Sequence, residues 1–381
     1  MLQKIWLQGE FDRSRAVTED GRAVEVLSPG RWNLLGGPDF TGAHLRLDGR
    51  TVSGAVEVHF HAGDWAAHGH QQDSAYANVV LHVVLFPPGP RDQPARTADG
   101  AVIPVLVMMP LLLRDLEEYA SDDALENLTA RGELRSIEAL ARLGSADRHS
   151  LLIRMSEQRW RQKIGFARAR IARLGWTEAA HHAALEILGY RFNRVPMLAL
   201  ASRHALAKWA DDIVSPRALF ESEGREWRLQ GVRPPNHPLA RLRQYKTWVK
   251  ACPNWPDRLR SMSVEVPVAA AAAVPASTRQ VRTVWRLRQL RERMAGVLCA
   301  GAIGGTRLDN LICDGFLPLL AAEGERDLSA VWFHWFPGDQ PAQIQGALRA
   351  LEETNRQQPL CHGLAQGFIG WRLSQETGAT N

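Results

Sequence analysis

The chain has 381 residues, of which 45% are hydrophobic and 23% are charged, the balance of an ordinary globular protein. This length is enough for two or three domains. No apolar stretch approaches the roughly 20 residues that a membrane helix needs, and the first residues lack the apolar core of a secretory signal. We therefore expect a cytoplasmic protein without a membrane partner.

The cysteines and the net charge indicate the state of the thiols and the kind of partner that the protein could bind. Cys252, Cys299, Cys313 and Cys361 are far apart and form no Cys-x-x-Cys pair, so we expect free thiols. The net charge is +5 with clustered arginines, which suits nucleic acid as a partner. An arginine-rich genome would produce the same excess without such a partner.

Strand patterns dominate the first part of the chain. Residues 24–27, 43–47 and 52–60 favour strands, and Asp48-Gly49 is a hairpin-turn signal. Residues 79–86 are almost continuously apolar, which predicts a central strand buried on both faces. Residues 102–109 predict an edge strand because Pro104 interrupts them. A helix or helical turn is expected over residues 65–78.

Helical spacing takes over after about residue 122. It predicts helices ending near Gly144, Gly175 and Gly189, and the predicted ranges are 123–143, 148–174, 177–188, 194–209 and 279–298, continuing to about 373. The alanine and proline run at 266–278 reads as a low-complexity linker. The predicted fold class is α+β, a mixed α/β sheet core followed by a mainly helical part. The predicted domains are 1–115, 122–265 and 279–381.

The predicted hairpin carries the most informative side chains. Glu57 and His59 are two residues apart on one strand and so share a face, while Val56, Val58 and Phe60 face the core.

The position of Asp39 relative to that pair depends on the strand register. A two-residue loop at Asp48-Gly49 pairs Asp39 with Val58, on the wrong face. A three-residue loop pairs it with Glu57, and a bulge at Gly54 pairs it with His59. We predict a register that brings Asp39 to the face of Glu57 and His59.

This pattern predicts a divalent-metal site. Carboxylates brought together are costly without a cation; their oxygens suit Mg²⁺ or Mn²⁺, and added imidazoles favour Mn²⁺ or Zn²⁺. The predicted catalytic residues are Asp39, Glu57 and His59, and the predicted metal ligands are Asp39, Glu57, His59, His68, His70 and His82. Two alternatives stay open: His82 as a hydrogen-bonded core histidine, and His68 with His70 as a solvated turn.

Several of these motifs together resemble a known family. Gly37-Pro38-Asp39-Phe40, Val56-Glu57-Val58-His59, His68-Gly69-His70 and Leu81-His82-Val83-Val84 are similar to an uncharacterised bacterial family, the domain-of-unknown-function family 2851. The likeness continues through residues 233–238 and Arg307-Leu308, and so covers most of the chain. The family carries no established activity.

A second, structural resemblance is to the PD-(D/E)XK nuclease core. The resemblance rests on Pro38-Asp39 opening one strand, Glu57-x-His59 on its partner, then a helix and a buried strand. It implies a restriction-endonuclease-like sheet in which Asp39, Glu57 and the Val58 carbonyl hold the metal. His59 would stand where the family has a lysine, which leaves room for a degenerate site that only binds.

Arginines interleaved with tryptophans suggest where nucleic acid would bind. Arg154, Arg161 and Arg168 are heptad-spaced on one predicted helix, and Arg286 and Arg293 lie on another. Such residues contact phosphates, and nearby aromatic rings stack on bases. The alternative is a solvated helix face whose arginine stems cover apolar neighbours.

The leading functional hypothesis is a divalent-metal-dependent, nuclease-like protein that hydrolyses phosphodiesters. Two alternatives stay open. One is a non-enzymatic interaction protein whose acidic and histidine cluster is structural or binds zinc. The other is a metal-dependent hydrolase of a small phosphorylated substrate.

Overall fold

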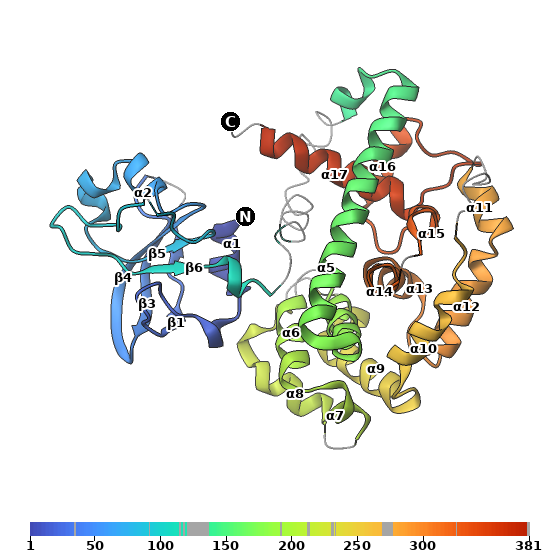
Figure 1. Ribbon diagram of the computed structural model, residues 1–381, viewed down its shortest axis with the longest axis horizontal. Helices are drawn as coiled ribbons and strands as arrows, with labels where there is room; N and C mark the ends of the chain where they lie inside the picture. The colour runs from blue at the N-terminus through green and yellow to red at the C-terminus, as the bar shows by residue number, and fades with distance from the viewer. Residues whose placement is uncertain are drawn as a thin grey trace. The chain divides into compact units, whose positions relative to one another are not determined.

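A computed structural model describes the chain apart from residues 34–35, 91, 114–115, 117–118, 120–136, 191–192, 212–213, 230–231, 233, 269–276, 325 and 379–381. The chain divides into two compact units, residues 1–120 (unit 1) and residues 121–381 (unit 2). Unit 1 holds the sheet and unit 2 is helical (Figure 1), which confirms the predicted α+β class. No described helix is both long and apolar enough to cross a membrane.

Unit 1 is built on a mixed sheet of strand order β1-β3-β4-β5-β6, with β2 paired to β3. The β1–β3 and β3–β4 pairs are antiparallel, and the β4–β5 and β5–β6 pairs are parallel. The strands are β1 (Val24–Ser28), β2 (Arg31–Trp32), β3 (Phe40–Leu47), β4 (Arg50–His59), β5 (Val79–Val84) and β6 (Val105–Val107). The predicted strands are confirmed, and β6 ends the strand order as an edge strand should.

Apolar side chains cover both faces of this sheet. On one face, Val56 and Val58 of β4 pack in a core with Ile5 and Trp6 of helix α1 (Leu2–Gln8). A smaller cluster of Ala55, Trp65, Tyr76, Val79, Ala95 and Ile103 includes Trp65 of helix α2 (Asp64–Ala67). Two 3-10 turns follow α2, at His70–Gln72 and Ser74–Tyr76. The expectation that Phe60 faces the core is wrong: β4 ends at His59, and Phe60 is 48% exposed.

The turn of the β3–β4 hairpin has two residues. Leu47 pairs with Arg50, which leaves Asp48 and Gly49 in the loop with φ of 46° and 78°. Positive φ at both central residues fits the right-handed twist of the flanking strands. The three-residue alternative is therefore wrong.

A bulge in β3 shifts the register farther along the hairpin. Ala43 pairs with Gly54, but Phe40 pairs with Val56, so β3 has one residue more than β4 over this stretch. Gly42 lies in the extra stretch with φ of 66°, a conformation that glycine adopts without strain. The expected bulge thus exists in β3 and not at Gly54.

Gly54 has a different role, because it lets β4 and β5 approach closely. A Cβ at Gly54 would lie 2.4 Å from the Asn78 carbonyl oxygen and 2.5 Å from a Val80 methyl. The carbonyl of Asn78 cannot withdraw easily, since it accepts a hydrogen bond from the Ala55 amide (2.9 Å).

We therefore expect Gly54→Ala to destabilise unit 1 by about 2 kcal/mol through overpacking. Chemical denaturation followed by circular dichroism measures the change. Gly36→Ala is the matched control, because a Cβ at Gly36 meets nothing within 4 Å. Equal stability of the two variants would contradict the close-approach explanation.

Unit 2 consists of helices around two hydrophobic clusters, a large one and a smaller one formed mainly by α16, α17 and the start of α5. Its longest helix, α5, contains a non-helical residue at Gly175 (φ 74°), where the sequence predicted a helix end. The predicted helix at 194–209 is two helices in the structure, because the backbone at His204 is extended. The helices are α5 (Ser145–Leu188), α6 (Arg194–Arg203), α7 (Leu206–Ala210), α8 (Pro216–Glu223), α9 (Pro238–Ala251), α10 (Trp255–Met262), α11 (Thr278–Val284), α12 (Leu287–Val297), α13 (Gly305–Asn310), a π-helix (Leu311–Phe316), α14 (Leu317–Glu323), α15 (Ser329–His334), α16 (Ala342–Ala350) and α17 (His362–Gly378). The predicted helix at 123–143 lies mostly outside the described residues.

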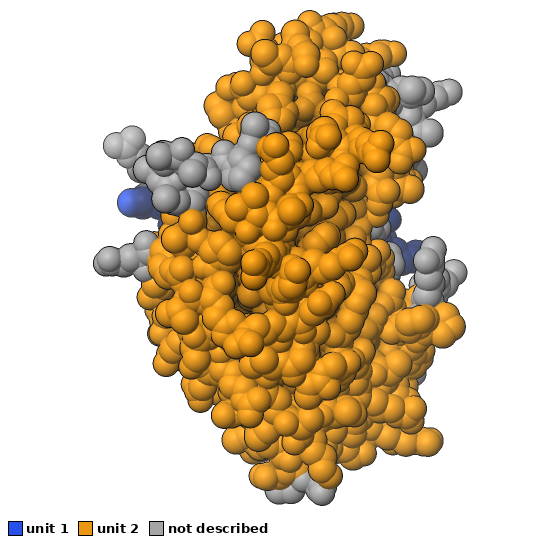
Figure 2. Space-filling view, turned by 90° about the vertical axis from the view of Figure 1, so that its right-hand side faces the viewer, with its two compact units in different colours: residues 1–120 blue, residues 121–381 orange. Residues whose placement is uncertain are grey.

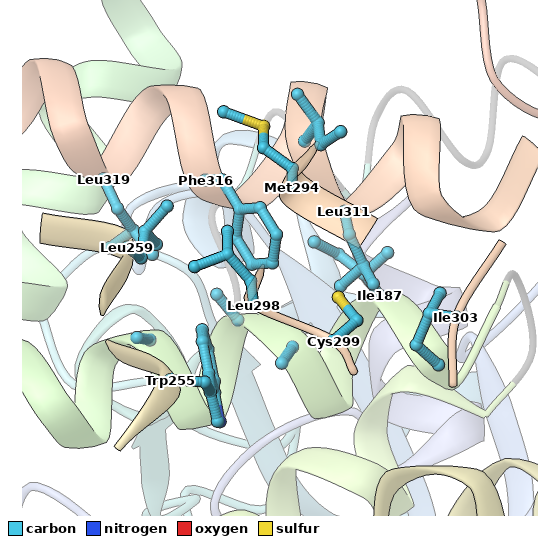
Figure 3. Packing of buried hydrophobic residues seen from close by; sticks show 14 of the residues in the cluster. Ile187, Trp255, Leu259, Met294, Leu298, Cys299, Ile303, Leu311, Phe316 and Leu319 are labelled. Atoms are coloured by element: carbon cyan, nitrogen blue, oxygen red, sulfur yellow. The ribbon is translucent and has the colours of Figure 1, made fainter. Parts of the chain in front are cut away.

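The core of unit 2 joins helices from both sides of the predicted linker at 266–278. Trp255 of α10 packs against Phe316 of the π-helix with ring centroids 5.8 Å apart, and Leu298 lies beside them (Figure 3). The surface of this unit is seen in Figure 2. All four cysteines are buried and free, as predicted.

A buried ion pair anchors the start of α5 to the segment after α16. Arg148 donates from Nε to Glu353 Oε1 (2.8 Å) and from Nη2 to the Leu351 carbonyl (2.8 Å). Glu353 Oε2 lies 2.8 Å from His149 Nδ1, and this hydrogen bond raises the pKa of His149.

The raised pKa has a defined consequence for stability. A protonated His149 is favoured in the folded state, so its contribution is complete below the ordinary pKa of 6.5 and is lost as pH rises through the raised value. We expect the stability difference between wild type and His149→Gln to shrink as the pH rises from about 6.5 through the raised pKa of His149. Denaturant titrations at several pH values measure it, with His44→Gln as the control, and a pH-independent difference would refute the pair's role.

Candidate metal centre

Three segments of unit 1 bring the predicted site residues together. Glu57 and His59 end β4, and His82 lies on the adjacent β5, where it pairs with Glu57. His68 caps α2, and His70 begins the next 3-10 turn. Between them Gly69 has φ of 73°, which reverses the chain so that both imidazoles return toward β4.

Three imidazoles and one carboxylate converge at this point. One ring nitrogen each of His59, His68 and His70 lies within 4.8 Å of the other two. His59 Nε2 is 3.2 Å from His68 Nδ1. Glu57 Oε1 is 3.3 Å from His59 Nε2 and 3.5 Å from His70 Nε2. The three ring nitrogens therefore form one compact group, and Glu57 Oε1 lies next to His59 and His70.

Asp39 lies beside this group and orients Glu57. The Asp39 amide donates to Glu57 Oε2 (2.8 Å), while Asp39 Oδ2 accepts from the Val58 amide (3.2 Å) and from Gln3 Nε2 (3.3 Å). The bulge thus brings Asp39 next to Glu57, but its carboxylate bonds to Val58 and Gln3. The structure does not place the Asp39 carboxylate among the three imidazoles.

His82 lies behind His59 rather than in the group. His82 is fully buried, and its Nε2 is 2.9 Å from His59 Nδ1. This contact fixes the His59 ring so that Nε2 faces Glu57 and His68. The structure places His82 as a hydrogen-bonded core histidine, the alternative that the sequence left open.

Burial controls the protonation of the site. It raises the pKa of Glu57 to about 7 and lowers the pKa of His59 to about 4 and of His82 to about 3. Burial and the neighbouring His68 also lower the pKa of His70. The rings of His59, His70 and His82 are therefore neutral at pH 7, the form in which a ring nitrogen can bind a metal.

Aromatic rings close one side of the group and leave another open. The Tyr76 ring stacks on His70 at 3.8 Å, and Trp65 contacts His70 and His82. Trp65 is held in place by its own hydrogen bond to the Arg96 carbonyl (3.0 Å). His68 is exposed, so solvent reaches the group from its side. His70 Nε2 is buried without a hydrogen-bond partner among the described residues.

The predicted nucleic-acid residues lie in unit 2. Arg154, Arg161 and Arg168 are exposed along α5. Arg286 lies between α11 and α12 with φ of 50°, so the second predicted basic helix is two shorter ones. Arg293 Nη2 donates to Glu265 Oε1 (2.8 Å).

Several neighbouring basic side chains form hydrogen bonds or ion pairs within unit 2. Arg159 donates a hydrogen bond to Gln366 (2.7 Å), Lys163 pairs with Asp314 (3.0 Å), and Arg291 pairs with Asp309 (2.6 Å). The arginine clusters therefore owe part of their density to packing between helices. Nucleic-acid contact by the five exposed arginines stays a prediction.

Comparison with known proteins places the chain in a family. The model of the family described as "Protein of unknown function (DUF2851)" matches residues 1–222, and the chain belongs to this family. The match includes all of unit 1 and confirms the first resemblance. No curated protein and no solved structure matches the chain. The resemblance to PD-(D/E)XK nucleases is not confirmed.

The hydrogen bonds of Asp39 predict how substitutions there behave. Asp39→Asn keeps a side-chain oxygen for the Val58 amide, whereas Asp39→Ala leaves that amide without its acceptor. We expect Asp39→Ala to lose about 1–2 kcal/mol of stability and Asp39→Asn to lose clearly less. Denaturant titration distinguishes them, and an equal loss in both would show that the negative charge, not the acceptor, is what matters.

Proposed function

We propose that His59, His68 and His70 hold one divalent cation, zinc before manganese, with Glu57 beside it, and that this centre hydrolyses phosphodiesters. The observation that carries the proposal is the convergence of three imidazole nitrogens within 4.8 Å of one another. Three nitrogen donors favour Zn²⁺ or Mn²⁺ over Mg²⁺, which prefers oxygen.

The separations between donor atoms support a tetrahedral ion. Zinc lies about 2.0–2.1 Å from nitrogen and oxygen donors, so neighbouring donors of a tetrahedral site are about 3.3 Å apart. The distance of 3.2 Å between His59 Nε2 and His68 Nδ1 agrees with that spacing, as do the distances of 3.3 and 3.5 Å from Glu57 Oε1 to His59 and His70. Glu57 itself lies outside the group whose atoms are all within 4.8 Å of one another. A cation would also give the buried His70 Nε2 a partner and would offset the cost of burying Glu57.

Residues around the four donors would keep them in place. His82 holds the His59 ring through Nδ1, and the Asp39 amide holds Glu57 through Oε2. Such outer contacts fix the orientation of metal ligands. A bound cation of this kind lowers the pKa of a water and polarises a phosphoryl oxygen, and the exposed side at His68 is where substrate would enter.

The substrate class rests on the order of elements and on charge. Pro38-Asp39 precedes β3, Glu57-x-His59 ends β4, and α2 and the parallel β5 follow, as the nuclease resemblance implies. The exposed arginines of α5 supply positive charge for a phosphate backbone. The proposal departs from that resemblance at Asp39, which here positions Glu57.

A second candidate function is a structural zinc site in a non-enzymatic protein. Such a site would need Glu57 to join the three imidazoles in a filled tetrahedral shell, as in closed structural sites. Metal content and activity measured on the same protein separate the two.

The test begins with full-length protein stripped of metal by a chelator and titrated with Zn²⁺ or Co²⁺. We expect one equivalent of zinc by elemental analysis and the visible absorption of tetrahedral cobalt. His68→Gln and His70→Gln should lose both signals, while His44→Gln, an exposed histidine outside the group, should keep them. Failure of the wild type to bind metal would refute the site.

Hydrolysis is then measured on labelled DNA and RNA with Zn²⁺ or Mn²⁺. We expect cleavage that falls at least about 100-fold in Glu57→Gln, which removes the negative charge beside the ion, and in His59→Ala, which removes a donor. Asp39→Asn should retain metal. Stoichiometric zinc with no cleavage of either nucleic acid would favour the structural site and reject the nuclease function.

A further inference from the structure

Unit 2 contains a cavity of about 310 Å³ between α5 and the α15 segment, with Gln358 also in its wall. Its walls include the aromatic side chains of Trp160, Trp332 and Phe333. Trp160 and Trp332 contact each other with ring centroids 5.1 Å apart. The volume is at the lower end of ordinary small-molecule sites, and flat apolar walls suit an aromatic ring.

Two polar groups in the walls have hydrogen-bonding capacity to spare. The Ser156 hydroxyl is fully buried and has no partner among the described residues. Buried hydroxyls normally find a partner, so one without a partner needs an explanation. His334 also lines the cavity, and the one hydrogen bond that its ring makes to a described residue is through Nδ1.

A chain of hydrogen bonds assigns the His334 tautomer. The Thr278 amide donates to Gln358 Oε1 (2.9 Å), so the other amide atom of Gln358 is the NH₂ that donates to Thr278 Oγ1 (2.7 Å). Thr278 is fully buried, and because its Oγ1 already accepts from Gln358, we infer that its hydroxyl donates to His334 Nδ1, 2.8 Å away. Nδ1 is then an acceptor, and Nε2 carries the hydrogen. Burial and Arg282 lower the pKa of His334 to about 4, which keeps the ring neutral.

The charged groups near the cavity are paired with one another. Glu353 bonds both Arg148 and His149 at 2.8 Å, and Glu157 is 3.9 Å from Arg161. None of these charges is isolated, so none of them selects a charged ligand.

We propose that this cavity binds an uncharged, bicyclic aromatic heterocycle whose ring nitrogen or carbonyl accepts a hydrogen bond from His334 Nε2. The ring system lies against Trp160, Trp332 and Phe333, and the Ser156 hydroxyl is available to a second polar atom. This site is separate from the metal centre of unit 1 and does not depend on it.

The test compares two probes of equal size, isoquinoline and naphthalene, which differ by one ring nitrogen. Ligand-detected NMR and calorimetry on the full-length protein, at a pH where isoquinoline is neutral, give both affinities. We expect isoquinoline to bind with a Kd on the order of 100 µM and about tenfold more tightly than naphthalene.

Variants locate the binding and assign the donor. Ala330→Phe fills the cavity from its half-exposed rim and should abolish binding of both probes, whereas Ala169→Phe, an exposed alanine on α5, should change neither. His334→Phe keeps an aromatic ring but removes the donor, so the two probes should then bind equally.

Three results would overturn the proposal: no binding of isoquinoline, equal binding of both probes to the wild type, or binding that survives Ala330→Phe. A thermal melt checks the folding of each variant. If His334→Phe fails to fold, the comparison of probes on the wild type and on Ala330→Phe decides the question.

Discussion

The candidate site of unit 1 depends on one extra residue in the β3–β4 hairpin. With the two-residue turn alone, the register set by Leu47 and Arg50 would place Asp39 opposite Val58. The bulge at Gly42 moves Asp39 by one position, so that its amide meets Glu57 Oε2. Since neighbouring strand residues face opposite ways, this single step determines which side of the sheet Asp39 serves.

The register shift at the bulge affects the candidate metal group through the two carboxylate oxygens of Glu57. Oε2 is occupied by the Asp39 amide, so Oε1 is directed to His59 and His70. His59 is similarly divided, with Nδ1 toward His82 and Nε2 toward the group. Each side chain therefore uses one atom for its support and presents the other. Burial under Trp65 and Tyr76 makes the arrangement costly unless the presented atoms also gain a partner.

Part of this could be predicted from sequence and part could not. Period-two spacing was enough to place Glu57 and His59 on one face, and Asp48-Gly49 was enough to locate the turn but not to fix its length. The bulge was misplaced because Gly42 and Gly54 both fit the pattern, and only the contact with Asn78 shows that Gly54 serves close approach. His68 and His70 were candidates by residue type, but Gly69, whose φ of 73° turns both toward β4, was the missed signal.

Unit 2 shows a second limit of prediction from sequence: the sequence does not reveal which side chains pair when they are far apart along the chain. Arg159 and Gln366 are 207 positions apart, and Arg148 and Glu353 are 205 apart, so clusters of arginine look unpaired in the sequence. Once such pairs are removed from consideration, the informative polar atoms are those that remain without partners. His70 Nε2 in unit 1 and the Ser156 hydroxyl in unit 2 are both of this kind. Folding alone would select against each of them, since an unpaired buried polar atom costs about 1–3 kcal/mol. The physical reason to keep such an atom is a ligand that completes its hydrogen bond or coordination. The two atoms have different neighbours, imidazoles around His70 and tryptophans beside Ser156, so the same reasoning leads to a cation in one unit and an aromatic molecule in the other.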